Sequence, residues 1–387
     1  MHPNRRTALG AATLAALAVV ATGCERGSSS STGASVEPST SGCPAAFATA
    51  KAAVRGAESR RTAWTGPTTG PKAVPHRTIV YVAQTMTNPG VVGTVHGAAE
   101  AAKAIGWKFE TIDGAGTPAG IQAALGQAIA LKPSGIVLGG FDPRATSQQV
   151  SEANAEGIPL IGWHAVDEPG PGKDPKLFTN ITTQVQDVAR ITAHWIIARS
   201  GGRAGVVLFT DASIPFARNK SELIRKALAA CSGVRLLSYE NIPLPDASSR
   251  VPQEVSSLLS RLGSRWTDSA AINDLYFGDA APALRAEGRP GSGPPFNIGA
   301  GDGGPSAFQR INSRQYQSAT VPEPLTQQGW QMIDEFNRAF TGCPASGYVA
   351  PVHVATAGNA GGALAWDPVG YQVAYRKIWE SKASPWL

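Results

Sequence analysis

The chain has 387 residues, of which 42% are hydrophobic and only 16% are charged. Its length predicts two domains, and its apolar content is sufficient for a core in each, which excludes a globally disordered chain. The formal net charge of +6 comes from Lys and Arg residues that are dispersed along the chain, so an extended nucleic-acid-binding surface is not expected.

The N-terminus has the form of an export signal. A basic start precedes a largely apolar stretch, residues 8–21, which is too short for an ordinary membrane-spanning helix. The stretch ends in Ala-Thr-Gly-Cys24, which resembles the cleavage box of bacterial lipoproteins, where the cysteine is acylated. Secretory cleavage with an incidental cysteine is the alternative, and the pair Arg5-Arg6 leaves the export route open. We therefore predict a signal peptide over residues 1–23 and an extracytoplasmic protein that is lipid-anchored to the cell membrane through Cys24.

The segment after the signal peptide predicts a tether and an oxidising environment. Residues 24–42 are rich in Ser, Thr, Gly and Pro, a composition typical of flexible linkers. Outside the cytoplasm cysteines tend to pair, and Cys43 and Cys343 both stand in Gly-Cys-Pro near the ends of the folded region. We predict a disulfide between these two, with two free thiols as the alternative. Cys231 ends an apolar helical pattern and is expected to be a buried thiol.

Strands and helices alternate along most of the chain. Residues 43–75 predict an N-terminal helix, over Cys43–Ser59, and a Pro-rich segment. In the first half the predicted strands are Thr78–Ala83, Trp107–Ile112, Gly135–Leu138 and Pro159–Trp163, and the helices between them lie near Val92–Ala104, Pro118–Leu131 and Ser147–Glu156. In the second half the predicted strands are Gly205–Phe209, Val234–Tyr239, Ala270–Ile272 and Phe296–Gly299, and the helices lie near Arg218–Ala230, Pro252–Leu262, Ala280–Glu287 and Pro305–Ser313. Further strands over Gln315–Val321 and Val349–Thr356 flank a helix over Gln327–Phe340.

This alternation predicts an α/β fold with two doubly wound parallel-sheet lobes joined by a hinge. Apolar strands separated by helices are typical of parallel sheets that are covered on both faces. The predicted organisation is lobe 1 over residues 76–181 plus 324–347, lobe 2 over residues 182–323 plus 348–356, and an aromatic-rich tail over residues 357–387 that packs as a short helix on a lobe.

Signatures of catalysis, of metal binding and of cofactor binding do not emerge from the sequence. There is no G-x-S-x-G, H-E-x-x-H or P-loop motif, and no two of the six histidines have the i, i+4 spacing of a helical metal site. Glycine-rich turns begin at Gly114 and Gly299, but Pro118 and Pro305 interrupt them, so tight turns are the better interpretation than dinucleotide sites. We therefore predict no enzyme activity, no cofactor and no metal.

Polar and aromatic residues stand at the carboxyl ends of nearly all the predicted strands. In open α/β sheets ligands bind at this edge, although any one such residue is equally explained as a helix cap or turn former. The set is Gln84, Thr87, Asn88, Asp142, Trp163, His164, Phe216, Arg218, Asn273, Asp274, Asp279 and Asp302. Its size favours a binding cleft between the lobes.

Several short segments of the chain occur in the order and spacing of a known family. They are Thr78-Ile-Val-Tyr-Val-Ala-Gln-Thr-Met-Thr-Asn88-Pro89, Ile158-Pro159-Leu-Ile, Ala283-Leu-Arg285 and Ile298-Gly-Ala-Gly-Asp302-Gly303. From about Thr78 to Thr356 the chain resembles the type I periplasmic binding proteins of sugar ABC transporters, the ribose-binding group in particular.

The resemblance implies roles for particular residues. It places Gln84 and Asn88 at sugar-contact positions, Asp302 as an acceptor for sugar hydroxyls, and Glu323 at a hinge crossing. Arg218 or Lys220 is expected to supply a cationic donor, and Asn273 a further contact, with Asp279 as a rival. The chain also departs from the family, because His164-Ala165 replaces an Asp-Arg pair and Gly90-Val91 replaces an aromatic pair. The acidic set, which is Asp142, Asp302 and Glu323, suits a sugar, a polyol or a ligand with a cationic group.

The function that the resemblance implies is capture of a small polar ligand between two lobes. The expected protein is the substrate-binding lipoprotein of an ABC importer, whose closed form docks on a permease. A sensory module that presents the same ligand to a membrane receptor or kinase is the alternative. A secreted enzyme is a third class, for which the sequence offers no nucleophile–base pair.

Overall fold

The computed structural model describes residues 42–59 and 63–381. The predicted signal peptide, Cys24 and most of the tether lie outside these ranges. Within them, no helix has the length and apolar character needed to cross a membrane.

The first lobe is built on a six-stranded sheet with the order β2-β1-β3-β4-β6-β5. Its strands are β1 (Thr78–Ala83), β2 (Lys108–Asp113), β3 (Gly135–Gly139), β4 (Leu160–Trp163), β5 (Gly170–Lys173) and β6 (Lys176–Ile181). Neighbouring strands are parallel except β5 and β6, which form an antiparallel hairpin. The apolar side chains of β1 alternate between two cores, so that Ile79 and Tyr81 pack with helices on one face, and Val80 and Val82 with helices on the other.

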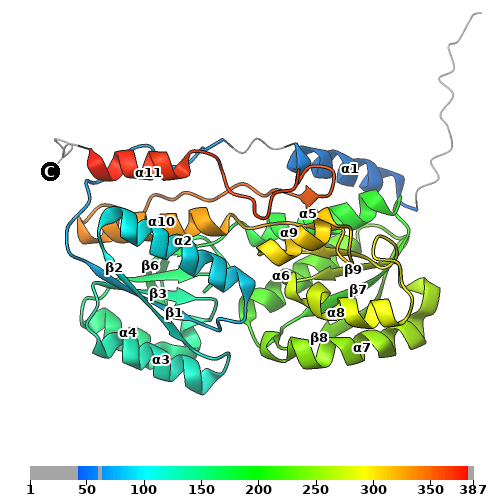
Figure 1. Ribbon diagram of the computed structural model, residues 1–387, viewed down its shortest axis with the longest axis horizontal. Helices are drawn as coiled ribbons and strands as arrows, with labels where there is room; N and C mark the ends of the chain where they lie inside the picture. The colour runs from blue at the N-terminus through cyan, green and yellow to red at the C-terminus, as the bar shows by residue number, and fades with distance from the viewer. Residues whose placement is uncertain (1–41, 60–62, 382–387) are drawn as a thin grey trace, which may run out of the picture. The chain divides into compact units, whose positions relative to one another are not determined.

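Helices cover both faces of this sheet. One face carries α2 (Pro89–Ile105) and α10 (Leu325–Phe340), and the other carries α3 (Pro118–Ala130), the 3₁₀ turn η1 (Pro143–Thr146) and α4 (Ser147–Ala155) (Figure 1). Each of α2 and α3 begins with a polar cap followed by proline: Asn88 Oδ1 accepts the Gly90 N–H and Thr117 Oγ1 accepts the Gly120 N–H.

The second lobe repeats this plan with the order β12-β11-β10-β9-β7-β8. Its strands are β7 (Ala204–Thr210), β8 (Val234–Asn241), β9 (Asp268–Ala271), β10 (Phe296–Gly299), β11 (Ala319–Thr320) and β12 (Ala355–Thr356), of which only β12 is antiparallel to its neighbour. One face packs with α5 (Val185–Arg199), α6 (Pro215–Leu228) and the N-terminal α1 (Pro44–Glu58). The other packs with α7 (Ala247–Leu262) and α8 (Leu275–Ala286), and α9 (Pro305–Asn312) follows β10. The short turns η2 (Leu244–Asp246) and η3 (Gly263–Arg265) flank α7.

The predicted fold class is therefore confirmed, with differences in three places. The hairpin β5–β6 was not predicted, because Gly170–Lys173 is Gly-Pro-Gly-Lys and carries no strand signal. Helix α5 was also missed, although its buried residues recur at helical spacing. The strands expected over Gln315–Val321 and Val349–Thr356 shrink to two residues each; in these segments the carbonyls of Tyr316 and Val354 accept hydrogen bonds from the side chains of Asn297 and Asn359.

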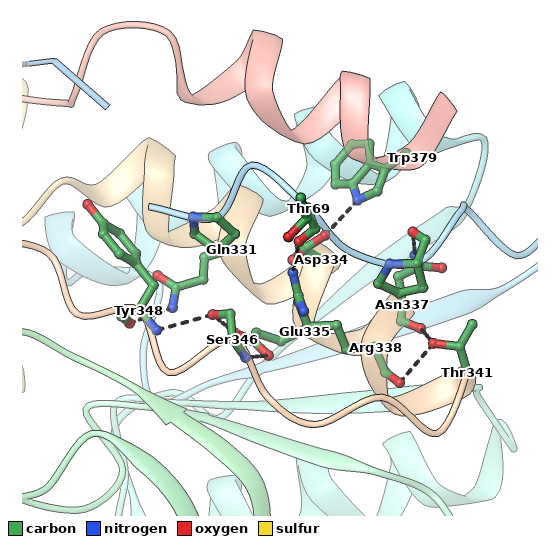
Figure 2. A network of polar contacts seen from close by, with 12 residues as sticks. Thr69, Gln331, Asp334, Glu335, Asn337, Arg338, Thr341, Ser346, Tyr348 and Trp379 are labelled. Atoms are coloured by element: carbon green, nitrogen blue, oxygen red, sulfur yellow. Dashed lines mark hydrogen bonds and ion pairs between the residues drawn. The ribbon is translucent and has the colours of Figure 1, made fainter. Parts of the chain in front are cut away.

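Helix α10 is buried from Leu325 to Arg338 apart from Thr326, although much of its outer surface is polar. The covering elements are the Pro-rich segment before β1, residues 346–348 and α11 (Tyr371–Glu380) in the tail (Figure 2). Polar side chains of α10 bond to all three: Arg338 Nη2 donates to Thr69 O at 2.9 Å, Glu335 accepts the Ser346 N–H at 3.1 Å, and Asp334 accepts the Trp379 indole N–H at 2.9 Å. These polar groups of α10 are thus satisfied by protein groups.

The disulfide joins Cys43 to Cys231, so the predicted pairing of Cys43 with Cys343 is wrong. Helix α1 packs along α5 in the second lobe, and Gly42, just before α1, bonds to Gly201 after α5 and to Ser232 after α6. There the Cα atoms of Cys43 and Cys231 are 5.3 Å apart, within the range that a disulfide requires. Cys343 is a free thiol just beyond α10, in the first lobe.

Candidate functional site

The carboxyl ends of both sheets face one another, and side chains from the two lobes meet there. Asn88 caps α2 in the first lobe, and its Oδ1 accepts a hydrogen bond from Asn273 Nδ2 at 3.1 Å. Asn273 follows β9 in the second lobe and also donates to Asp302 Oδ2. These three side chains are buried and form a continuous polar chain across the lobes, as their predicted strand-end positions indicated.

Asp302 stands in a tight turn between β10 and α9. Gly301, Asp302 and Gly303 all have positive φ, at 119°, 67° and 65°. A side chain at Gly303 would meet Pro322 Cβ at 2.3 Å, so glycine is required there by both conformation and space. The turn brings the carboxylate of Asp302 against Gly90, at the first turn of α2 in the other lobe. This geometry supports the interpretation of the glycine motif as a turn.

The carboxyl group of Asp302 has a pKa close to neutral pH. Burial raises its pKa, and the neighbouring carboxylates of Asp274 and Glu323 add to this, while Lys220 and Asn273 oppose it; the resulting pKa is about 7. Asp274 has a structural role, because it accepts the Gly303 N–H at 2.7 Å and the Thr320 hydroxyl at 3.1 Å.

Lys220, and not Arg218, is the buried cation of this cleft. Both residues are on α6, but Arg218 is exposed while Lys220 is 3% exposed. Lys220 Nζ donates to Ala300 O at 2.7 Å and lies 5.0 Å from the centre of the Phe216 ring. Of the two alternatives, the structure therefore buries Lys220 beside the polar chain and leaves Arg218 exposed, since two residues along a helix point to different faces.

Glu323 occupies the crossing between β11 and α10, as expected of a hinge residue. Its Oε1 accepts the Thr183 hydroxyl at 2.5 Å, its Oε2 accepts Gln328 Nε2 at 2.6 Å, and His164 Nε2 lies 3.4 Å from Oε1. Burial alone would raise the pKa of Glu323, but His164, Lys220 and the Thr183 hydroxyl together lower it to about 2. Glu323 therefore stays ionised and ties the crossing to both neighbouring segments.

An aromatic stack crosses the cleft beside this carboxylate. The rings of Trp163 and His164, at the end of β4, are stacked with centroids 4.1 Å apart, and His164 stacks on Phe216 of α6 at 4.6 Å. Burial lowers the pKa of His164, and the nearby Glu323 carboxylate offsets only part of this lowering. The indole N–H of Trp163 donates to Gln328 Oε1 at 2.8 Å. The stack joins the first lobe to the start of α6.

The other predicted residues, Gln84, Asp142 and Asp279, form none of the hydrogen bonds of the polar chain. Gln84 is 5% exposed, and its Oε1 is buried without a hydrogen-bond partner. Asp142 Oδ1 caps η1 by accepting the Arg144 N–H at 2.9 Å. Asp279 lies inside α8, half-buried, where the nearby Arg310 opposes the rise in its pKa that burial causes.

The sequence analysis did not predict Thr183 and Gln328, both of which bond to Glu323. Gln328 lies in a helix that was predicted, whereas Thr183 precedes α5, which was not.

No cluster of three or more His, Cys, Asp and Glu side chains suited to a metal ion occurs among the described residues. The charged groups of the cleft are instead bonded to one another and to backbone. What the arrangement offers chemically is a set of hydrogen-bonding groups and an aromatic surface from two lobes.

Comparisons with known proteins agree with this architecture. A family model described as a periplasmic binding protein domain matches residues 79–342. A sugar ABC transporter protein from Yersinia enterocolitica superposes with a TM-score of 0.66 at 16% identity, over 78% of this chain and 95% of that one. An ABC transporter solute-binding protein from Agrobacterium vitis with bound allitol superposes with a TM-score of 0.61 at 17% identity, over 78% and 99%.

A third structure, a twin-arginine translocation pathway signal protein from Burkholderia phytofirmans, superposes with a TM-score of 0.64 at 18% identity, over 80% of this chain and 95% of that one. At these identities the likeness shows the fold. No curated protein matches the sequence.

Proposed function

This chain belongs to the periplasmic binding protein family and has the two-lobe type I fold, and from that premise we propose that it is the substrate-binding protein of an ABC importer. The family is a solute-binding, non-catalytic class. In this proposal the protein works outside the cytoplasm, captures a sugar or sugar-like molecule between its lobes and delivers it to a permease.

The observation that carries the proposal is the polar chain of Asn88, Asn273 and Asp302. Carboxylate and amide groups can bond to hydroxyls, and each hydrogen bond to a charged group contributes about 1.5–3 kcal/mol. Because the chain draws on both lobes, a ligand bonded to it would hold them together. An analogue that lacks one hydroxyl would leave a buried partner unpaired, which provides specificity.

A thermal-shift screen of sugars, polyols and small amines tests this proposal. A ligand that binds only the folded protein stabilises it by about 2.7 kcal/mol when its concentration is 100 times the Kd. We expect at least one sugar or polyol to raise the melting temperature by several degrees. If only amines or no probes do so, sugar capture is wrong.

The anchor and the partner belong to the same proposal and need separate tests. Cys24→Ser should abolish incorporation of labelled fatty acid, and label that persists would contradict lipid attachment. Co-purification with an ABC permease after crosslinking would support import, whereas recovery of a receptor or kinase would favour the sensory alternative.

A further inference from the structure

A cavity of about 210 Å³ lies between the lobes. It is lined in the first lobe by the end of β1, the start of α3 and the turn η1, and in the second lobe by residues 213–215. For comparison, an apolar cavity of roughly 150 Å³ holds one benzene molecule. The cavity can therefore accommodate a group the size of one six-membered ring.

The walls of this cavity are mainly apolar. Pro118, Ile121 and Phe141 line it from the first lobe, and Ile214 and Pro215 line it from the second. A hydroxyl-covered ring would leave its hydroxyls facing these groups without partners, which costs free energy. An apolar ring has no such cost and gains from burial.

The polar side chains that line the cavity are engaged elsewhere, with one exception. Asp142 Oδ1 accepts the Arg144 N–H, the Thr146 hydroxyl donates to Pro143 O at 3.3 Å, and the Ser213 hydroxyl donates to Asp211. Gln84 is different, because its buried Oε1 has no partner. Among the described residues that line the cavity, Gln84 thus carries a buried acceptor without a partner.

The cavity is connected to the groups proposed to hold the hydroxyls through neighbouring side chains. A side chain added at Gly140 would lie 3.4 Å from Val91 Cγ2, 3.5 Å from Gln84 Cβ and 3.9 Å from Trp163 Cζ3. Val91 follows Gly90, which contacts Asp302. Gln84 lines the cavity and shares the neighbourhood of Gly140 with Val91, so a short series of contacts through Gly90 leads from the cavity wall to Asp302.

We propose that the ligand has two parts, a hydroxyl-bearing part held by Asp302, Asn88 and Asn273, and an apolar ring held in this cavity with one donor directed to Gln84 Oε1. An aryl glycoside is the simplest compound of this class. The inference rests on the proposed function and narrows its substrate class.

The test compares paired probes on the purified protein. For each of several sugars, affinities are measured by titration calorimetry for the methyl glycoside, the phenyl glycoside and the disaccharide with the same first sugar. We expect the phenyl glycoside of at least one sugar to bind about tenfold or more tightly than its methyl partner. The 4-hydroxyphenyl glycoside should bind more tightly still, and this gain should vanish in Gln84→Met.

A variant that fills the cavity tests whether the preference for phenyl over methyl glycosides arises there. Ala145 is exposed and lines the cavity, so Ala145→Phe should fold and reduce the preference for phenyl over methyl. Ala48→Phe is the matched control, because Ala48 is an exposed alanine on α1, and it should leave the preference unchanged.

The possible failures are distinguishable. If methyl glycosides or free sugars bind and no phenyl partner binds more tightly, the apolar-ring inference is wrong while the proposed function stands. A disaccharide that binds more tightly than the phenyl glycoside also overturns the inference, as does a phenyl preference that survives Ala145→Phe. If no carbohydrate binds at all, the proposed function itself fails.

Discussion

Lys220 balances the buried charge of the cleft. Its ammonium group lies among the carboxylates of Asp302, Glu323 and Asp274, which partly offset the lowering of its pKa by burial. Sequence reasoning found the neighbouring polar residues because a strand-end position is a local property. It could not choose between Lys220 and Arg218, since the face that α6 turns toward β10 depends on packing.

Lys220→Met should lower the free energy of unfolding by about 3–5 kcal/mol, because it leaves buried carboxylates without their cation. Arg218→Met is the control on the same helix, and it should change stability by no more than about 0.5 kcal/mol, since Arg218 is exposed. Urea unfolding of the two variants measures the difference, and equal effects would contradict the assignment.

Asp302 should make stability depend on pH. Its pKa is about 7 in the folded protein, against an ordinary value of 3.8, so the folded state holds the proton more tightly. Its contribution to stability is therefore largest below about pH 4, falls between about pH 4 and pH 7, and is constant above.

The loss of stability between about pH 4 and pH 7 should be smaller in Asp302→Asn than in the parent protein. Melting temperatures of both proteins between about pH 4 and pH 8 measure it. Glu335, whose pKa burial also raises to about 7, is present in both proteins and cancels in the comparison. Identical pH profiles would show that Asp302 does not titrate in this range.

At the scale of elements, α10 is unusual in being buried with a polar outer surface. Asp334 accepts hydrogen bonds from Arg338 Nε at 2.8 Å and from the indole N–H of Trp379 at 2.9 Å. It thereby joins α10 to α11 (Figure 2). The helix itself was predictable from its amphipathic pattern. Its covering was not, because the covering segments lie far away in the sequence and meet it only in the folded chain.

Asp334→Ala should lower the free energy of unfolding by about 3–5 kcal/mol, since it leaves the largely buried Arg338 without its carboxylate partner. Asp187→Ala removes the exposed ion pair with Arg190 and should cost no more than about 1 kcal/mol. Denaturant unfolding of both variants provides the comparison, and a small effect for Asp334→Ala would show that the network on α10 contributes little.

The disulfide shows a second limit of the sequence. The loop-like Gly-Cys-Pro surroundings of Cys43 and Cys343 suggested a pair, but the pairing depends on α1 packing along α5, which no local pattern reveals. The apolar strands, in contrast, were found at nearly their observed bounds, because a buried parallel strand is apolar throughout.

Cys43→Ser should destabilise the protein by about 2–4 kcal/mol, whereas Cys343→Ser should have little effect. A protein that starts at Glu25 lacks Cys24. Thiol titration of this protein, denatured but not reduced, should find a single reactive cysteine, Cys343. Three reactive cysteines would contradict the bond between Cys43 and Cys231.

At the scale of the whole molecule, the two lobes are connected through several segments. The chain passes between them before α5, before α10 and after α10, and the tail then returns to pack α11 on the first lobe. Glu323 bonds to Thr183 and Gln328, and so links the first two of these crossings. We propose that the crossings act as the hinge, and that opening separates Asn88 from Asn273 and Asp302 so that a ligand can enter before the lobes close on it.

Titration calorimetry of the parent protein and Asp302→Asn, with the best probe from the thermal-shift screen, tests this central claim most directly. The account predicts that the parent binds one ligand per chain, and that Asp302→Asn stays folded but loses about tenfold or more in affinity, which corresponds to ~1.4 kcal/mol or more of binding free energy. Unchanged affinity in Asp302→Asn would place the ligand elsewhere and contradict the inter-lobe site.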